Sequence, residues 1–245
     1  MYLFFTDAGN IDGTAAQITG PDVNHIKNVL RMKPGDIIRV CDGGGACYIC
    51  RIAALEPERV TCDIIEKDEN GTELPASTTI LQGIPKGDKM EFVIQKNVEL
   101  GINTIVPVQM ARSVVRLDAQ RAQSKQKRWQ AIALSAAKQS KRTAVPAVEL
   151  PQSFKAAVDG TRGHDLKILP YENEVGIASA RRIIDRVEPG MSIAFIIGPE
   201  GGFEPEEVAY AEEAGYERIS LGRRILRTET AGMVLMSAIM MKLEQ

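Results

Sequence analysis

The sequence has few of the side chains that bind transition metals. Its 245 residues include two histidines, His25 and His164, which do not form a spaced pair, and one CxxC at Cys47 and Cys50. The surrounding "ACYICRIAAL" has the pattern of a β-strand, and residues three apart on a strand face opposite sides. We therefore expect no metal centre. The four cysteines are expected to be buried or half-buried thiols in a reducing compartment: Cys41, Cys47, Cys50 and Cys62.

The chain also lacks a strong net charge and a long apolar run. The formal net charge is -2, so bulk charge indicates no class of partner. The longest nearly apolar stretch, Ala231 to Met241, is too short to cross a bilayer. The first residues, "MYLFFTDAGN", have no basic segment and reach Asp7 too early for a signal peptide. We therefore expect a cytoplasmic protein.

The first seventy or so residues have a β-rich pattern. "GDIIRVCDGGGACYICRIAAL" predicts two strands joined by a glycine hairpin, and "RVTCDIIEK" predicts another strand. "PDVNHIKNVLRM" predicts one short helix, with Pro21 and Asp22 at its start. "KDENGTELPAS" is polar and carries an Asn-Gly turn signal, which indicates a linker. We predict a small β-rich domain over residues 1–72.

From Thr78 onward, strand patterns alternate with helix patterns. This alternation predicts a mostly parallel sheet covered by helices on both faces, an α/β domain over residues 73–245. The predicted strands are 78–84, 104–110, 165–172, 192–198 and 218–222, and the predicted helices are 88–101, 118–142, 177–187, 204–215 and 230–244.

A glycine-rich loop, "GPEGG", lies between a predicted strand and an acidic helix. It has neither the GxxxxGK[ST] of a P-loop nor the GxGxxG of dinucleotide folds. Pro205 stands near the first helical position, so Glu206 and Glu207 fall in the first turn and occupy the positive end of the helix dipole. A polyphosphate is therefore disfavoured, whereas a ligand with hydroxyls, an adenine ring and a positive centre suits the loop. A tight turn that needs glycine only for its geometry is an equal alternative.

A second loop, "LGRRILRTETAG", also follows a strand and precedes a helix that Thr228 or Thr230 is able to cap. With "LPYEN" after a third strand, the loops would converge if their strands are neighbours. The alternative is that the arginines of this segment are solvated surface charges: Arg223, Arg224 and Arg227.

Together, "IIGPEGGFEPEEV" and "LGRRILRTETA" resemble the corresponding segments of the RsmE family of the SPOUT superfamily. Further matching segments are "QGIPKGDKMEFVIQKNVELGI", "PVQMARSVV", "HIKNVLRMKPGD" and "DGGGACY". The resemblance spans essentially the whole chain. It implies an N-terminal PUA-like β-barrel and a trefoil-knotted α/β methyltransferase domain that acts as a homodimer. Knots are nearly absent among folds, and no periodicity in the sequence indicates one.

The resemblance also implies S-adenosylmethionine as the cofactor. Similar enzymes bind it in a bent shape within the knot, largely through backbone groups of three loops. Since a sulfonium cofactor has no phosphate, glutamates beside the loop are tolerated. The positions that match the family's cofactor site are Leu169, Tyr171, Glu172, Ile197, Gly198, Gly201, Gly202, Leu221, Gly222, Ile225, Leu226, Thr230 and Ala231.

The implied reaction is methylation of uridine N3, at uridine 1498 of 16S rRNA in the small ribosomal subunit. N3 carries a proton that has to be removed, so the uridine develops negative charge. Arg227 is the first candidate to stabilise that charge. Glu229 would orient Arg227 or assist proton loss, and Glu200 is a further candidate. The alternatives are a SPOUT enzyme acting on tRNA or on a ribose 2'-hydroxyl, and a noncatalytic RNA-binding assembly factor.

The distribution of charge supports an RNA partner. Residues 112–142 hold nine basic residues and a single acid, Asp118. In the predicted helix, Trp129 belongs to an apolar face and is expected in the core, whereas a basic face is able to follow a phosphate backbone. A solvated helix surface is the alternative. The RNA-contact candidates, including two in the N-terminal domain, are His25, Arg31, Arg112, Arg116, Lys138, Lys141 and Arg142.

The last predicted helix has no polar face. Met233, Val234, Leu235 and Met236 begin an apolar sequence that continues to Leu243 and surrounds the helix axis. A helix that is apolar all round has to be buried on most sides. We therefore predict a homodimer that uses this helix.

Overall fold

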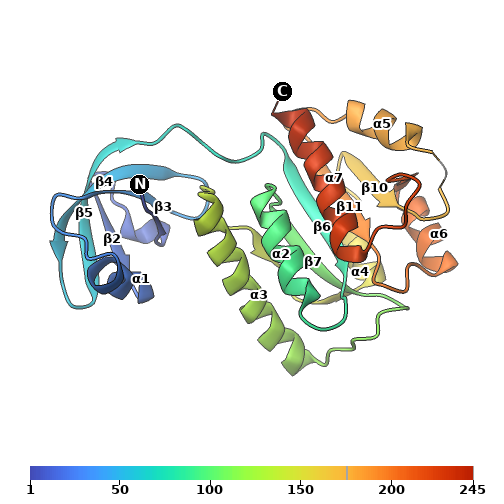
Figure 1. The fold of residues 1–245 in the computed structure, drawn as a ribbon, viewed down its shortest axis with the longest axis horizontal. Coiled ribbons are helices and arrows are strands. Elements are labelled where there is room, and N and C mark those ends of the chain that lie inside the picture. Colours follow the sequence, from blue (N-terminus) through green and yellow to red (C-terminus); the bar gives the residue numbers. More distant parts are fainter. Residues whose placement is uncertain (175, 245) are drawn as a thin grey trace. The chain divides into compact units, whose positions relative to one another are not determined.

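The computed structural model describes residues 1–174 and 176–244 (Figure 1). The chain divides into two compact units. Unit 1 comprises Met1–Glu73 and Ala137–Val145, and unit 2 comprises Leu74–Ala136 and Pro146–Gln245. Unit 1 therefore includes residues 137–145, which a single division at residue 72 assigns to the second domain.

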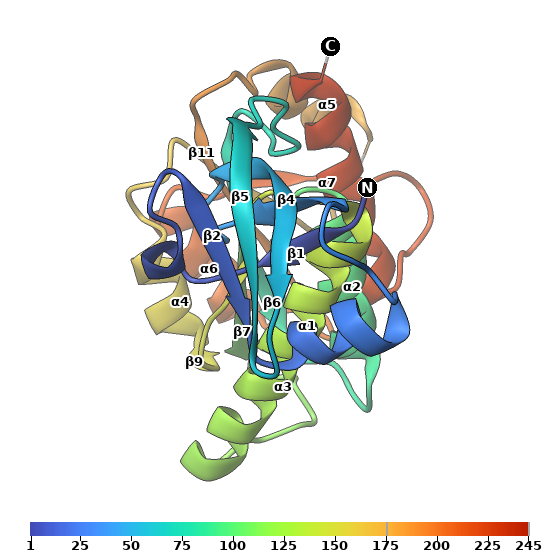
Figure 2. The ribbon, with the colours of Figure 1, turned by 90° about the vertical axis from the view of Figure 1, so that its left-hand side faces the viewer.

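Unit 1 is built on a five-stranded sheet with the order β1-β3-β4-β5-β2. Figure 2 looks onto this unit and shows β2, β5 and β4 running side by side. The predicted glycine hairpin is present, since β3 and β4 pair antiparallel with Cys41 opposite Cys47. The elements are β1 (Leu3–Phe5), η1 (Ala8–Asn10), β2 (Ala15–Thr19), α1 (Pro21–Asn24), η2 (His25–Val29), β3 (Ile37–Cys41), β4 (Cys47–Leu55) and β5 (Arg59–Lys67).

The core of unit 1 follows from alternation along its strands. Ile38 and Val40 on β3 and Ile52 on β4 are buried and pack together with Val60 on β5. Side chains at alternate positions face the same side of a sheet, so these residues form one apolar face. The predicted short helix also forms, with Pro21 at its start.

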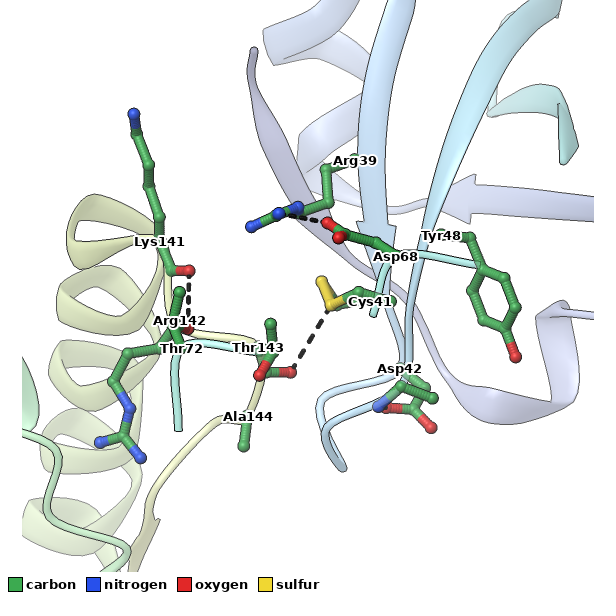
Figure 3. Close-up of a disulfide and its surroundings, with 12 residues drawn as sticks. Arg39, Cys41, Asp42, Tyr48, Asp68, Thr72, Lys141, Arg142, Thr143 and Ala144 are labelled. Carbon is green, nitrogen blue, oxygen red and sulfur yellow. Dashed lines mark hydrogen bonds and ion pairs between the residues drawn. A yellow bond between two sulfur atoms is a disulfide. The ribbon is translucent and has the colours of Figure 1, made fainter. Parts of the chain in front are cut away.

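Two of the four cysteines form a disulfide, so the prediction of four thiols is wrong. Cys41 and Cys47 stand directly opposite each other on β3 and β4, and their sulfurs are bonded. Figure 3 shows this site beside Thr143, whose carbonyl oxygen lies 4.0 Å from Cys47 Sγ. The CxxC does not act as a pair, because Cys50 belongs to a different apolar cluster from Cys47.

The other two cysteines are buried thiols. Burial raises the pKa of Cys50 to about 11, and burial, with smaller contributions from Cys50 and Asp63, raises that of Cys62 to about 12. A thiol with so high a pKa is scarcely ionised at neutral pH and is a poor nucleophile. No group of three or more His, Cys, Asp or Glu able to hold a metal ion occurs among the described residues.

Glu73 ties the end of unit 1's first segment to its second segment. Its carboxylate accepts hydrogen bonds from Arg142 Nε at 3.1 Å, from Thr143 N at 2.9 Å and from Ala144 N at 3.1 Å, and it also pairs with Arg142 Nη2. Arg142 is 3% exposed. The prediction that Arg142 belongs to an exposed basic face is therefore wrong.

Unit 2 contains a seven-stranded sheet with the order β12-β10-β11-β6-β7-β8, in which β9 also pairs with β7. Every pairing in this sheet is parallel, as the alternation of elements predicts. Its strands are β6 (Ser77–Gly83), β7 (Thr104–Gln109), β8 (Ala147–Val148), β9 (Gln152–Ser153), β10 (Leu166–Pro170), β11 (Ser192–Ile197) and β12 (Glu217–Ile219).

Helices cover this sheet. Helices α2 and α7 lie against each other, and α4 and α6 form a second contacting pair (Figure 1). Successive residues of a strand serve opposite sides, since Leu81 packs in the cluster that contains Val208 of α6, while its neighbour Ile80 contacts Gly232 of α7. The helices are α2 (Lys89–Glu99), α3 (Ala119–Ser140), α4 (Phe154–Gly160), α5 (Ala178–Asp185), α6 (Pro205–Glu213) and α7 (Thr228–Leu243).

The helices agree with the predicted ones, with two differences. The helix α4 was not predicted; it has seven residues, and the side chain of Ser153 caps it by accepting a hydrogen bond from Ala156 N. Thr228 does not cap α7, because the N-cap position is Arg227. Trp129 is 2% exposed, as expected for a core residue. Across the described part of the chain, every helix is too short or too polar to span a bilayer.

Candidate active site

The carboxyl ends of β10, β11 and β12 lie at one edge of the unit 2 sheet. These strands are neighbours, because β10 pairs with both β11 and β12 and all three run parallel. The loops that follow them therefore converge, as the sequence analysis anticipated for neighbouring strands. The carboxyl edge of such a sheet is where α/β proteins bind ligands.

A pocket occupies this edge. It lies between the three loops and the start of α2, and its lining mixes backbone with cationic, acidic and apolar side chains. The lining residues are Lys89, Pro170, Tyr171, Glu172, Ile197, Gly198, Pro199, Glu200, Gly202, Phe203, Ser220, Leu221, Gly222, Arg223, Arg224, Ile225, Leu226, Arg227, Thr228 and Ala231.

Most of the residues predicted for cofactor binding line this pocket. The exceptions are Leu169, Gly201 and Thr230, and each of them is next in sequence to a residue that lines the pocket. Leu169 is fully buried in the core beneath the loop. The sequence analysis missed Lys89, which comes from a different segment of the chain and reaches the pocket from the first residue of α2.

Glycine is required at two points of the "GPEGG" loop and at one point beneath it. Gly202 has φ of 69°, a left-handed conformation that favours glycine. A Cβ on Gly201 would lie 2.9 Å from Arg112 Cβ. At the end of β6, a Cβ on Gly83 would lie 2.6 Å from the backbone nitrogen of Pro199. The loop therefore sits against β6 and the segment after β7 at backbone distance.

The carboxylate of Glu200 is fixed by the segment that follows β6. Glu200 Oε1 accepts hydrogen bonds from Lys89 Nζ at 2.8 Å and from Lys86 N at 3.2 Å. Burial favours the neutral acid, but the Lys89 and Lys86 hydrogen bonds and the charge of Lys89 outweigh it, and the pKa of Glu200 lies below its usual value. A carboxylate stabilised in this way is a weak proton acceptor.

Arg112 holds the other end of the same loop. Its Nε donates to Glu204 Oε1 at 2.9 Å, its Nη2 donates to Glu204 Oε2 at 3.2 Å, and its Nη1 donates to the carbonyl oxygen of Gly201 at 3.0 Å. The hydrogen bond from Arg112 lowers the pKa of Glu204. Arg112 was predicted to contact RNA, but the structure gives its guanidinium three bonds to the pocket loop.

Glu207 in the first turn of α6 also fixes the end of this loop. Its Oε1 accepts a hydrogen bond from Ala111 N at 2.8 Å, and its Oε2 accepts one from Glu204 N at 3.0 Å. Pro205 occupies the first turn, as predicted. An acceptor near the start of a helix satisfies donors that have no partner within the helix. The acids of this segment therefore connect the loop to its surroundings.

Arg227 and Glu229 lie at the start of α7 with unlike environments. Arg227 is exposed and lines the pocket. Glu229 does not line the pocket, and its Oε2 is buried with no hydrogen-bond partner among the described residues. Leaving a buried carboxylate oxygen without a donor is costly, so a hydrogen-bond donor at this position would be favoured.

The residues predicted to bind RNA have mixed surroundings. His25 and Arg31 are exposed, and Arg31 adopts a left-handed backbone with φ of 54°. Lys138 is half-buried and donates to Asp22 at 2.7 Å and 2.9 Å. Arg116 donates to the carbonyl oxygen of Ala111 at 3.0 Å. The exposed residues of this set are His25, Arg31, Arg112, Arg116 and Lys141.

The pocket lining carries side chains of both charges. Glu172 and Glu200 line it beside the "GPEGG" loop, and three acids of the loop and α6 already use the nearest cation and backbone N–H groups. Arg223, Arg224 and Arg227 also line the pocket, from the loop after β12. A ligand that carries a positive centre with apolar and hydrogen-bonding parts would meet acids, backbone and apolar side chains that complement it.

Comparisons with known proteins agree with this geometry. A family model described as an RNA methyltransferase domain matches residues 72–240, and one described as an RNA methyltransferase PUA domain matches residues 18–65. The ribosomal RNA small subunit methyltransferase E of Bacillus subtilis is 40% identical over 225 residues, 91% of this chain and 88% of that protein. The protein of the same name from Mesomycoplasma hyopneumoniae is 34% identical over 220 residues, 90% of this chain and 91% of that protein.

A solved structure is similar over the whole chain. The crystal structure of a ribosomal RNA small subunit methyltransferase E from Neisseria gonorrhoeae bound to S-adenosylmethionine has a TM-score of 0.85 at 34% identity, covering 98% of this chain and 96% of that one. The family model covers more than half of the chain, and the identity to the curated relatives extends over nine tenths of it. The chain belongs to the RNA methyltransferase family that includes the ribosomal RNA small subunit methyltransferases E.

Proposed function

We propose that this protein methylates N3 of uridine 1498 of 16S rRNA in the assembled small ribosomal subunit, with S-adenosylmethionine as methyl donor. The observation that carries the proposal is the convergence of three loops on one pocket at the carboxyl edge of the parallel sheet. The relative from Neisseria gonorrhoeae binds S-adenosylmethionine, which supports the same cofactor here.

We assign some pocket residues to cofactor binding and others to catalysis. Ten of the thirteen residues expected to bind the cofactor line the pocket, which supports that assignment. When bound, S-adenosylmethionine would supply an electrophilic methyl group. Well-oriented reacting groups gain about 7–11 kcal/mol from positioning, so the loops contribute by holding the reactants in line.

Arg227 is the proposed catalytic residue. Its exposed guanidinium lines the pocket and is able to stabilise negative charge on the uridine as N3 loses its proton. Glu229 follows two residues later and lies outside the pocket lining, and its buried Oε2 has no donor among the described residues, so it is the proposed orienting group for Arg227. Glu200 is assigned to the loop instead, because Lys89 already holds its carboxylate.

RNA contacts are proposed for exposed residues of both units. Each unit carries candidates, with His25, Arg31 and Lys141 in unit 1 and Arg112 and Arg116 in unit 2. We keep residues 1–72 as a PUA-like RNA-binding domain and residues 73–245 as the methyltransferase domain, with the trefoil knot implied by the family. Counterion release upon phosphate binding predicts that affinity falls as salt rises.

A homodimer is proposed through α7. Val234 and Met241 are 40% and 65% exposed on this helix, and they lie seven residues apart, so they share one face. Exposed apolar side chains aligned on a helix are typical of an interface. Sedimentation equilibrium at micromolar concentration should give a dimer, and Val234→Lys with Met241→Lys should give a monomer. A stable monomer in the unmodified protein would contradict this part of the proposal.

The activity is tested by transfer of a labelled methyl group to assembled small subunits, free 16S rRNA and tRNA, followed by mass mapping of the product. We expect label at one uridine of the small subunit. Arg227→Ala should lower turnover by about 10²–10³-fold, the range for loss of a group that stabilises developing charge. Arg182→Ala, an exposed arginine on α5 outside the pocket, is the control. Labelling of tRNA alone would contradict the proposed substrate.

A further inference from the structure

A buried chain of hydrogen bonds joins three segments at the pocket, where Gly198 and Thr228 belong to the lining. Gln82, at the end of β6, donates from Nε2 to Thr228 Oγ1 at 2.8 Å. Thr228 Oγ1 donates in turn to the carbonyl oxygen of Gly198 at 2.6 Å. Gln82 is fully buried and Thr228 is 6% exposed. The chain therefore connects the first residue of α7 to the loop after β11.

The carbonyl groups at the two ends fix the direction of this chain. Gln82 Nε2 also donates to the carbonyl oxygen of Gly83 at 2.9 Å. A carbonyl only accepts, so the amide nitrogen of Gln82 has to face this side, and Thr228 Oγ1 accepts a hydrogen bond from it. The hydroxyl hydrogen of Thr228 is then left for the carbonyl of Gly198, which again only accepts. Neither polar group has an alternative arrangement of equal quality.

Stability alone gives little reason for polar side chains at these positions. Gln82 Oε1 is buried without a hydrogen-bond partner among the described residues. Its neighbour Leu81 and the strand residue Ile80 are apolar and buried. Replacing both partners of a buried hydrogen bond by apolar groups of similar shape is often close to neutral for folding. The pair therefore has to be explained by what it holds in place.

The Gln82–Thr228 pair holds two walls of the pocket in place. Gly198 lines the pocket from the loop after β11, and Arg227, which precedes Thr228, lines it from the loop after β12. The Thr228 hydroxyl bonds one of these loops directly to the other. Lys89 and Arg112 also bond to the "GPEGG" loop, but they belong to the start of α2 and to the segment after β7, not to the loop after β12.

We propose that Thr228, oriented by Gln82, is a positioning residue that keeps the Gly198 loop and Arg227 in the arrangement that binds the methyl donor. The inference rests on the proposed function of this pocket. Without the hydroxyl, the two loops separate part of the time, and the apparent affinity falls by the fraction of molecules that keep the competent arrangement.

The test compares Thr228→Val, which keeps the shape and removes the hydroxyl, with Thr228→Ser, which keeps the hydroxyl. Calorimetric titration with S-adenosylmethionine should give a Kd about tenfold higher for Thr228→Val and within about threefold of the unmodified protein for Thr228→Ser. The KM for the methyl donor should rise in parallel. Methyl transfer at saturating donor should fall several-fold in the valine variant, because Arg227 is attached to the same turn.

Thr161→Val is the matched control. Thr161 is 4% exposed in the same unit, its hydroxyl donates to the carbonyl oxygen of Val158 at 2.9 Å, and it does not line the pocket. The same substitution there removes a buried hydroxyl bond and should lower the melting temperature without changing the Kd for the donor. Equal Kd changes in the two valine variants would overturn the inference in favour of a general loss of stability.

Gln82 provides the second arm. Gln82→Met in the unmodified background should raise the Kd by less than Thr228→Val does, because the hydroxyl remains but is no longer oriented. In the Thr228→Val background it should add little, since the bond that it orients is already gone. If the effects of Gln82→Met and Thr228→Val on the free energy of donor binding are fully additive, the role of Gln82 in orienting Thr228 is refuted. If the unmodified protein fails to bind the donor, the proposed function fails, whereas unchanged affinity in Thr228→Val refutes only the positioning role.

Discussion

The sharpest prediction for stability concerns Glu73. This carboxylate accepts bonds from Arg142 and from the backbone N–H groups of Thr143 and Ala144, and thereby joins the two chain segments of unit 1. Its partner Arg142 is 3% exposed, so Glu73→Ala takes the carboxylate from a buried guanidinium. Removing one member of a buried ion pair costs about 3–5 kcal/mol. We expect a value near the lower end, because the side chain of Glu73 is 20% exposed.

Hydrogen exchange followed by mass spectrometry is the suitable assay, because a protein of two units need not unfold in one step. Peptides that cover residues 137–145 and 68–74 should exchange faster in Glu73→Ala, by about two orders of magnitude for a loss of about 3 kcal/mol. Peptides from β10 and β11 should keep their exchange rates. Glu69→Ala, an exposed acid four residues earlier, is the control. Loss of protection below threefold at residues 137–145 would refute the argument.

The same contact makes a prediction about pH. Burial would raise the pKa of Glu73, but the hydrogen bond and charge of Arg142 and the bonds from Ala144 and Thr143 outweigh it, so the pKa is lowered from 4.5. A carboxyl group whose pKa is lower in the folded state stabilises that state above its unfolded pKa and loses this contribution as pH falls through the folded value. The difference in stability between the unmodified protein and Glu73→Gln should therefore be full at neutral pH and shrink below pH 4.5.

Three further outcomes are expected. Thiol titration of the unreduced, denatured protein should find two groups rather than four, and Cys41→Ser with Cys47→Ser should lower the stability of unit 1 by about 2 kcal/mol; four titratable thiols would contradict the disulfide. Lys141→Gly should stabilise by about 1 kcal/mol in urea unfolding, because φ is 60° at this position; no gain would mean that another contact of Lys141 compensates. Gly83→Ala should raise the Kd for the methyl donor and destabilise by about 1–3 kcal/mol, since its methyl would meet the Pro199 nitrogen at 2.6 Å; unchanged binding and stability would show that the loop yields.

Local pattern was sufficient to predict most of the elements. The apolar run 192–198 and the acidic segment that begins at Pro205 identified β11, its loop and α6, because a strand, a glycine turn and a helix start each have their own residue signals. The sequence did not determine whether β10, β11 and β12 are neighbours, because strand order depends on contacts between distant segments. Once that order is given, the convergence of the three loops follows from chain direction, whereas the thirteen cofactor candidates came from the family resemblance, and ten of them line the pocket.

What the sequence could not show are the partners of individual side chains. Arg142 belongs to a basic segment and was predicted on its exposed face, but its partner Glu73 lies 69 residues away in the sequence. Thr228 stands in a sequence that suits a helix cap, yet its hydroxyl bonds to Gly198, 30 residues away. Cys41 and Cys47 are paired by the register of β3 and β4, which residue spacing alone does not determine. Each error concerns a tertiary contact that overrides a local preference.

The acids around the "GPEGG" loop acquire a common explanation from these contacts. Glu200 is bonded to Lys89 and Lys86, Glu204 to Arg112, and Glu207 to the backbone of Ala111 and Glu204. In a loop that binds phosphate, the backbone N–H groups and nearby cations are left for the ligand. Here carboxylates of the protein use Lys89, Arg112 and the N–H group of Glu204, and these contacts tie the loop to the neighbouring segments. A loop held by contacts within the protein is already in its binding arrangement, so the cost of ordering it is met in folding rather than in binding.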